Sequence, residues 1–94
     1  MLVERLEVTV KDGGESEFQT ILSKNLVSLL QGVDGVRSAQ GGQGVENPSK
    51  FILLVEWESM EKHTAYQGSP TSLEVRQLMK PFVANAAMEH FEIT

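Results

Sequence analysis

The longest apolar run in the chain is residues 51–57, FILLVEW, and it predicts a strand with two hydrophobic faces. The run is rich in strand-forming residue types and far too short to cross a membrane. Alternation along a strand would put Phe51, Leu53, Val55 and Trp57 on one face, and Ile52 and Leu54 on the other. Both faces need burial, and a small chain has few helices to cover them. We therefore expect a homodimer in which a second copy of the sheet covers the outer face.

The first half of the chain contains three more periodic segments. Alternating polar and apolar residues predict a strand over residues 2–10. Residues 15–31 carry apolar side chains at i, i+3 and i+4 spacing, which predicts an amphipathic helix ended by Gly32. Residues 36–44 predict a weak strand, because Gly41, Gly42 and Gly44 suggest a bulge or a close backbone approach. We expect this strand to form a hairpin with the apolar strand that follows it.

The second half begins with two helix start signals. Ser59 is suited to cap a short helix over residues 60–66, and Ser69 followed by Pro70 is suited to start another that runs to about Lys80. Residues 82–94 predict a last strand. The order is β-α-β-β-α-β, so the predicted fold is an α+β, ferredoxin-like antiparallel sheet with both helices on one face.

Composition narrows the class of protein. Ninety-four residues make a single domain, 1–94, and a net charge of -5 without a Lys/Arg cluster argues against nucleic acid and anionic membranes as partners. The absence of cysteine removes disulfides, thiolate metal sites and thiol nucleophiles. The charged N-terminal strand does not resemble a signal peptide, and no apolar segment reaches the ~20 residues of a membrane helix. The default expectation is a cytoplasmic protein.

Three side chains at and just after the end of the apolar strand are candidates for a small-molecule site. His63 follows the apolar strand on a short helix near the rim of the sheet, where it would serve either as an acid or base in a pocket or as a structural histidine. Trp57 would either flank a ligand with its indole or anchor the core or the dimer. Tyr66 lies one turn after His63 and would either share its cavity or pack against a loop.

No other sequence motif strongly indicates a catalytic or binding site. The two histidines, His63 and His90, have no metal-binding spacing, so no metal site is predicted. Arg76 fits a solvated helix face better than an anion site. The glycine-rich 41–44 segment lacks the phosphate-loop pattern, and no nucleophile elbow or dinucleotide fingerprint occurs.

Three local patterns resemble the antibiotic biosynthesis monooxygenase family of the dimeric α+β barrel superfamily. They are Trp57-Glu58-Ser59-Met60-Glu61-Lys62-His63, then Ser69-Pro70, then Met88-Glu89-His90-Phe91. The resemblance implies a homodimer with its two sheets packed face to face and a pocket in each protomer between sheet and helices. It implies His63 as a pocket residue, with Trp57 and Tyr66 as pocket walls.

The resemblance also implies an activity. Characterised members oxidise polycyclic phenols or quinols without metal or flavin, and others degrade haem with an asparagine on the first strand. The first strand of this chain has no asparagine, which argues against haem degradation. The first hypothesis is a cofactor-independent monooxygenase acting on an aromatic or quinol-type small molecule, with His63 as the base. The alternative is a non-catalytic dimer that binds a small ligand or has a stress-related role.

Overall fold

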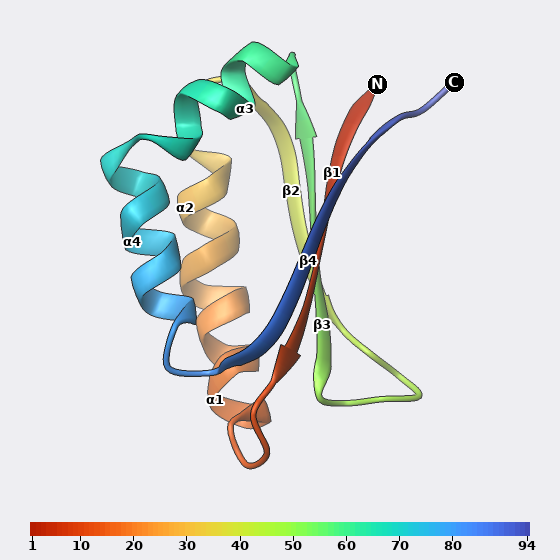
Figure 1. The fold of residues 1–94 in the computed structure, drawn as a ribbon, viewed down its shortest axis with the longest axis vertical. Helices are drawn as coiled ribbons and strands as arrows, with labels where there is room; N and C mark the ends of the chain where they lie inside the picture. The colour runs from red at the N-terminus through yellow and green to blue at the C-terminus, as the bar shows by residue number, and fades with distance from the viewer.

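The computed structural model describes residues 1–94 and has one antiparallel sheet with every helix on the same face, as Figure 1 shows. The elements are, in order, β1 (Leu2–Val10), α1 (Glu15–Ile21), η1 (Leu22–Leu26), α2 (Val27–Gln31), β2 (Val36–Gln43), β3 (Lys50–Trp57), α3 (Met60–Gln67), α4 (Pro70–Met79) and β4 (Val83–Glu92). The segments α1, η1 and α2 form one continuous helix, which is the first helix of the predicted β-α-β-β-α-β order. The predicted α+β, ferredoxin-like fold is therefore confirmed.

The strands lie in the order β2-β3-β1-β4, so β1 is a central strand between β3 and β4. Leu6 of β1 pairs with Leu53 of β3 on one side and with Met88 of β4 on the other. This register decides which side chains meet beneath the helices. Because β4 is an edge strand, its side chains stay accessible from outside.

The core lies between the sheet and the helices. Its buried apolar residues come from every element except α3 and β4: Val8, Val10, Phe18, Leu22, Leu26, Leu30, Ala39, Phe51, Leu53, Val55, Trp57, Val75 and Met79. The prediction that one face of the 51–57 run is buried is confirmed, since the four side chains on that face are at most 2% exposed.

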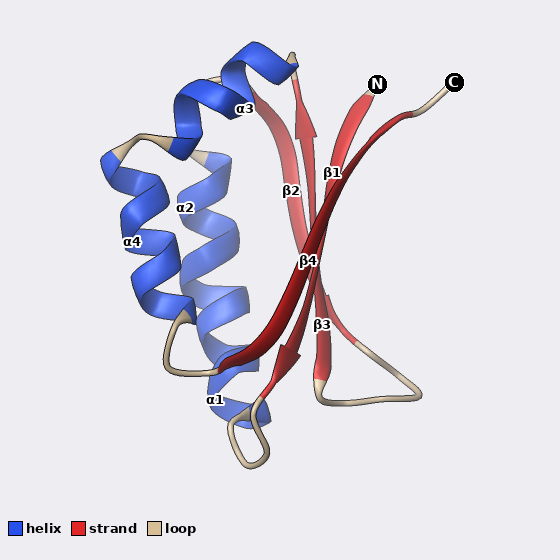
Figure 2. Ribbon diagram, viewed as in Figure 1, coloured by secondary structure: helices blue, strands red, loops and turns tan.

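The opposite face of the sheet carries no helix, as Figure 2 shows. Ile52 and Leu54 lie there and are half-buried within one protomer. The edge of the same sheet adds Phe91, which is 43% exposed. The structure thus leaves uncovered the apolar surface for which the sequence predicted a second copy.

The long helix contains a π turn that the sequence pattern did not predict. Its buried residues Phe18, Leu22, Leu26 and Leu30 are spaced strictly four apart. In an α-helix side chains four apart rotate by about 40° at each step, which would carry this stripe away from the sheet. The wider π turn of η1 counters that drift. The stripe therefore stays on the sheet over its full length.

The glycine-rich β2 strand makes the close approach that the sequence predicted. A Cβ built on Gly41 would lie 2.8 Å from Cγ of Leu22. Only a residue without a side chain leaves room for the long helix at this point.

The two short helices begin where their capping residues predicted. The Oγ atoms of Ser59 and Ser69 accept hydrogen bonds from the amides of Lys62 (3.3 Å) and Ser72 (3.2 Å). Neither these helices nor the longer one has the length and apolarity needed to cross a membrane.

Gly35 holds the turn between α2 and β2 and should not tolerate a side chain. Its φ of 91° is left-handed, and an added Cβ would run into the side chain of Lys62. We expect Gly35→Ala to lower the free energy of unfolding by about 2–4 kcal/mol in a urea titration. The matched control is Gly68→Ala, because nothing lies within 4 Å of a Cβ there and its φ is negative. Equal stability of the two variants would contradict the expectation.

Candidate active site

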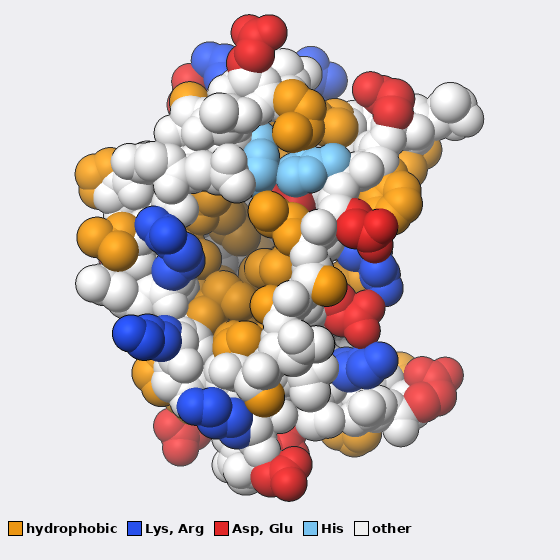
Figure 3. Space-filling view, in the orientation of Figure 1, with side chains coloured by type: hydrophobic (Ala, Val, Ile, Leu, Met, Phe, Trp, Pro, Cys, Tyr) orange, Lys and Arg blue, Asp and Glu red, His pale blue; other side chains and the backbone are white.

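A cavity of about 410 Å³ lies between the sheet and the helices α3 and α4. Nine of its 15 lining residues are hydrophobic. Figure 3 shows the hollow with an apolar floor and histidine side chains at one edge. Its size and its few polar groups are those of a small-molecule site.

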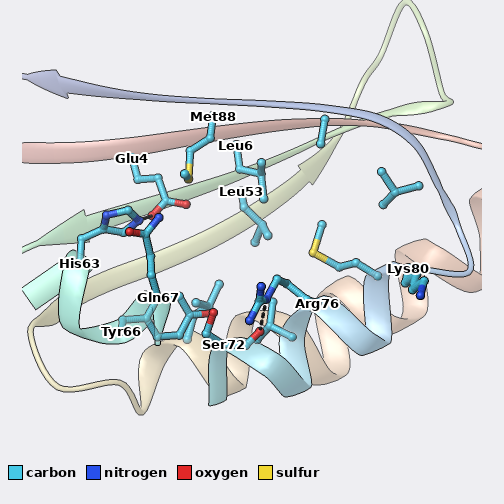
Figure 4. A pocket seen from close by; sticks show the side chains of 15 residues that line it. Glu4, Leu6, Leu53, His63, Tyr66, Gln67, Ser72, Arg76, Lys80 and Met88 are labelled. Atoms are coloured by element: carbon cyan, nitrogen blue, oxygen red, sulfur yellow. Dashed lines mark hydrogen bonds and ion pairs between the residues drawn. The ribbon is translucent and has the colours of Figure 1, made fainter. Parts of the chain in front are cut away.

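The polar end of the cavity is formed by Glu4 and His63, which Figure 4 shows side by side. Glu4 occupies a helix-facing position of β1 and is only 8% exposed. Its Oε1 accepts a hydrogen bond from Nε1–H of Trp57 at 2.9 Å. Nε2 of His63 lies 3.3 Å from the same oxygen. The carboxylate is therefore positioned by the indole and in turn positions the imidazole.

The second histidine joins this group from the edge strand. His90 is the cross-strand partner of Glu4, and its Nε2 lies 4.0 Å from Oε1 of Glu4. The rings of His63 and His90 meet edge to face with centroids 4.3 Å apart. Nδ1 of His63 and Nε2 of His90 are buried and have no hydrogen-bond partner. Glu4, His63 and His90 thus bring together a carboxylate and two imidazoles, the side chains that hold divalent transition metals.

Burial lowers the pKa of His63 below its usual 6.5. The Glu4 carboxylate opposes this shift, and His90 adds to it. His63 is therefore neutral at pH 7 and has a nitrogen lone pair that can accept a proton.

A histidine NMR titration tests this assignment directly, because the chain has only two histidines. In the chelator-treated protein we expect the Cε1–H signal of His63 to titrate with a midpoint below 6.5, since burial outweighs the attraction of Glu4. A His90→Gln variant identifies which signal is which. A midpoint above 6.5 would mean that the carboxylate outweighs burial.

Tyr66 and Trp57, the other two candidates from the sequence, differ in their position relative to the cavity. Tyr66 lines the cavity, and burial raises the pKa of its phenol, so it stays protonated and can donate a hydrogen bond. Trp57 is 1% exposed and does not line the cavity. Its ring centroid lies 5.2 Å from that of His63 and 5.5 Å from that of Tyr66. Trp57 therefore supports the site from behind.

Two cationic side chains line the cavity, Arg76 from α4 and Lys80 at the C-terminal end of that helix. Figure 4 shows Lys80 at the end opposite His63 and Arg76 between them. Neither forms an ion pair, and Nε–H of Arg76 donates only to the carbonyl oxygen of Ser72 at 3.4 Å. The sequence favoured a solvated helix face for Arg76. The structure puts it on the rim of the cavity.

Sequence reasoning missed Glu4 altogether and gave His90 no role. A signal for Glu4 was present, because it interrupts the apolar positions Leu2, Leu6, Val8 and Val10 on one face of β1. His90 had no comparable signal, since its approach to Glu4 follows from the strand register.

The fold and the cavity define a small α+β protein with an apolar pocket that has an acid and an imidazole at one end. The chain belongs to the antibiotic biosynthesis monooxygenase family, whose model matches residues 1–78. The family resemblance seen in the sequence is therefore confirmed.

Curated relatives include the uncharacterised protein YczJ of Bacillus subtilis, which is 30% identical over 98% of both chains. The protein SchA of Streptomyces halstedii is 28% identical over 83% of this chain, and the match spans only 20% of SchA. Among solved structures, a protein of Bordetella bronchiseptica has a TM-score of 0.87 at 20% identity, covering 99% of this chain and 97% of that one. Rv0793 of Mycobacterium tuberculosis has a TM-score of 0.83 at 15% identity, covering 99% and 94%. These similarities support the fold.

Proposed function

We propose that this protein is a small oxygenase that oxidises an electron-rich aromatic or quinol-type molecule without metal or flavin, in the cytoplasm. The observation that carries the proposal is the buried His63, which lies against Glu4 at the polar end of an otherwise apolar cavity. Family membership supports the same class of reaction.

In the proposed reaction, His63 is the catalytic base. It takes a proton from the phenol or from the activated CH₂ group of the substrate, and Glu4 stabilises the imidazolium that forms. The electron-rich anion then reacts with O₂ directly. For a substrate of the anthrone type, CH₂ and O₂ give C=O and H₂O, so the substrate supplies all four electrons and no external reductant is needed.

The remaining lining residues suit an aromatic substrate. The apolar floor would hold the rings away from water, and the Tyr66 phenol would donate a hydrogen bond to a substrate oxygen. Arg76 and Lys80 would favour a substrate with an anionic substituent at the far end of the cavity.

Oxygen uptake with a panel of anthrones and hydroquinones tests the proposal. We expect uptake well above the uncatalysed rate with at least one anthrone, and a single oxygen atom from ¹⁸O₂ in the product. Binding of these compounds with no turnover would contradict the proposal and favour the alternative, a ligand-binding protein with no catalytic activity.

We also propose that the protein is a homodimer formed by the open faces of two sheets. Ile52, Leu54 and Phe91 supply apolar area on that face, and the charge of Glu7 there is balanced by Arg5 and Lys50. We expect sedimentation velocity at micromolar concentration to give a species of twice 10.4 kDa. A folded protein that sediments at 10.4 kDa would contradict the dimer.

A further inference from the structure

The only two histidines of the chain converge on a buried carboxylate. Glu4 comes from β1, His63 from α3 and His90 from β4, and their ligand atoms all lie within 4.8 Å of one another. Residues this far apart in sequence meet only through the fold, so no local motif accounts for the cluster.

The cluster has no Lys or Arg to balance the charge of Glu4 and only one indole hydrogen-bond donor. No Lys or Arg forms an ion pair with Glu4, whose side chain is 10% exposed. The carboxylate accepts a hydrogen bond from the indole N–H of Trp57, which carries no charge. A buried carboxylate without a counter-charge is costly, and the two unpartnered imidazole nitrogens add to that cost.

We propose that Glu4, His63 and His90 form a binding site for a divalent transition-metal ion of the Zn²⁺ type. One carboxylate oxygen and two imidazole nitrogens are a donor set that such ions prefer, and the ion would supply the missing positive charge. The Trp57 hydrogen bond would then orient the ligating carboxylate, as outer partners do at metal sites.

The spacing needs one small adjustment. Ligands held about 2.0–2.1 Å from a tetrahedral ion lie roughly 3.4 Å apart, and Nε2 of His63 is already 3.3 Å from Oε1 of Glu4. His90 must approach that oxygen by less than about an ångström from its 4.0 Å distance, and the two imidazoles must close by at most about 1.4 Å, since all three ligand atoms lie within 4.8 Å of one another. Its side chain is 20% exposed on an edge strand and its Nε2 makes no hydrogen bond, so the movement breaks no hydrogen bond of that atom. The cavity beside Glu4 and His63 leaves room for a water or ligand as the fourth donor.

A bound ion would also regulate the proposed reaction. It would occupy the lone pair that His63 needs as a base, so metal binding and turnover would exclude each other. This consequence rests on the proposed function, whereas the metal site itself does not.

The test is calorimetric titration of chelator-treated, tag-free protein with Zn²⁺ near neutral pH. The background is low, because the chain has no cysteine and no histidine outside the cluster. We expect one ion per chain and binding weakened about tenfold or more in Glu4→Gln and in His90→Ala. The matched control is Glu89→Gln, which removes a carboxylate next to His90 on the outer face of β4 and should bind like the wild type. Absence of one-to-one binding, or equal binding by all four proteins, would overturn the site.

A second readout does not depend on whether the variants fold. In the wild-type protein Zn²⁺ should shift the NMR signals of both histidines together, with an end point at one equivalent. A shift of one histidine alone would overturn the three-ligand site. In oxygen uptake, one equivalent of Zn²⁺ should abolish turnover and a chelator should restore it. Full turnover with the ion bound would overturn the regulatory consequence. A protein that never turns over but binds Zn²⁺ would fail the proposed function and keep the metal site.

Discussion

Replacing His63 with glutamine is expected to lower the rate of oxygen uptake by about 10²–10⁴-fold. Glutamine keeps approximately the size of the side chain and can donate a hydrogen bond, but it cannot accept a proton from the substrate. The loss should therefore fall on kcat, with little change in KM. Steady-state uptake with the best substrate of the panel measures both constants.

The control for this variant is Thr64→Ala, an exposed position next to His63 on α3. It should keep the wild-type rate, and circular dichroism should show that both variants are folded. Full turnover by His63→Gln would remove the base from the mechanism.

The largest effect on stability is expected at Phe18. Its side chain is 1% exposed, and its ring packs edge to face against Phe51 and Phe82 with centroids 4.9 Å and 5.9 Å away. Phe18→Ala would leave a cavity between helix and sheet and should cost about 3–5 kcal/mol of unfolding free energy. Since small domains have about 5–15 kcal/mol in total, much of the stability would be lost.

Urea denaturation of the wild type and the variant measures this cost. Val45→Ala is the control, because Val45 is 90% exposed and its truncation should change stability by less than about 0.5 kcal/mol. A loss below about 1 kcal/mol at Phe18 would mean that the site collapses around the smaller side chain. Such a result would mean that packing around Phe18 contributes little to the stability of the fold.

The sequence predicted those parts of the fold that local interactions determine. Ser59 and Ser69 start their helices through side-chain oxygens that bond amides three residues on. The inward face of β3 is buried because its side chains alternate. The π turn was not predicted because apolar residues spaced four apart also fit an ordinary amphipathic helix. The two differ only once the whole stripe has to contact a sheet.

The candidate site could be predicted only in part. His63 and Tyr66 share one short helix, so their spacing alone suggested a common cavity. The place of Glu4 between Trp57 and the two histidines depends on which strands pair and in which register. Local periodicity carries no information on that register, and so the role of Trp57 behind the site could not be foreseen.

The contact of Gly41 with Leu22 has a consequence for how a guest molecule enters. The Leu22 side chain of the long helix packs directly on the backbone there, so sliding or lifting the helix would break this close contact. Helix α4, in contrast, packs beside the cavity, and its only buried apolar side chains are Val75 and Met79. Movement that admits a larger molecule is therefore expected in α4 and at the edge strand β4, while the rest of the protein stays in place.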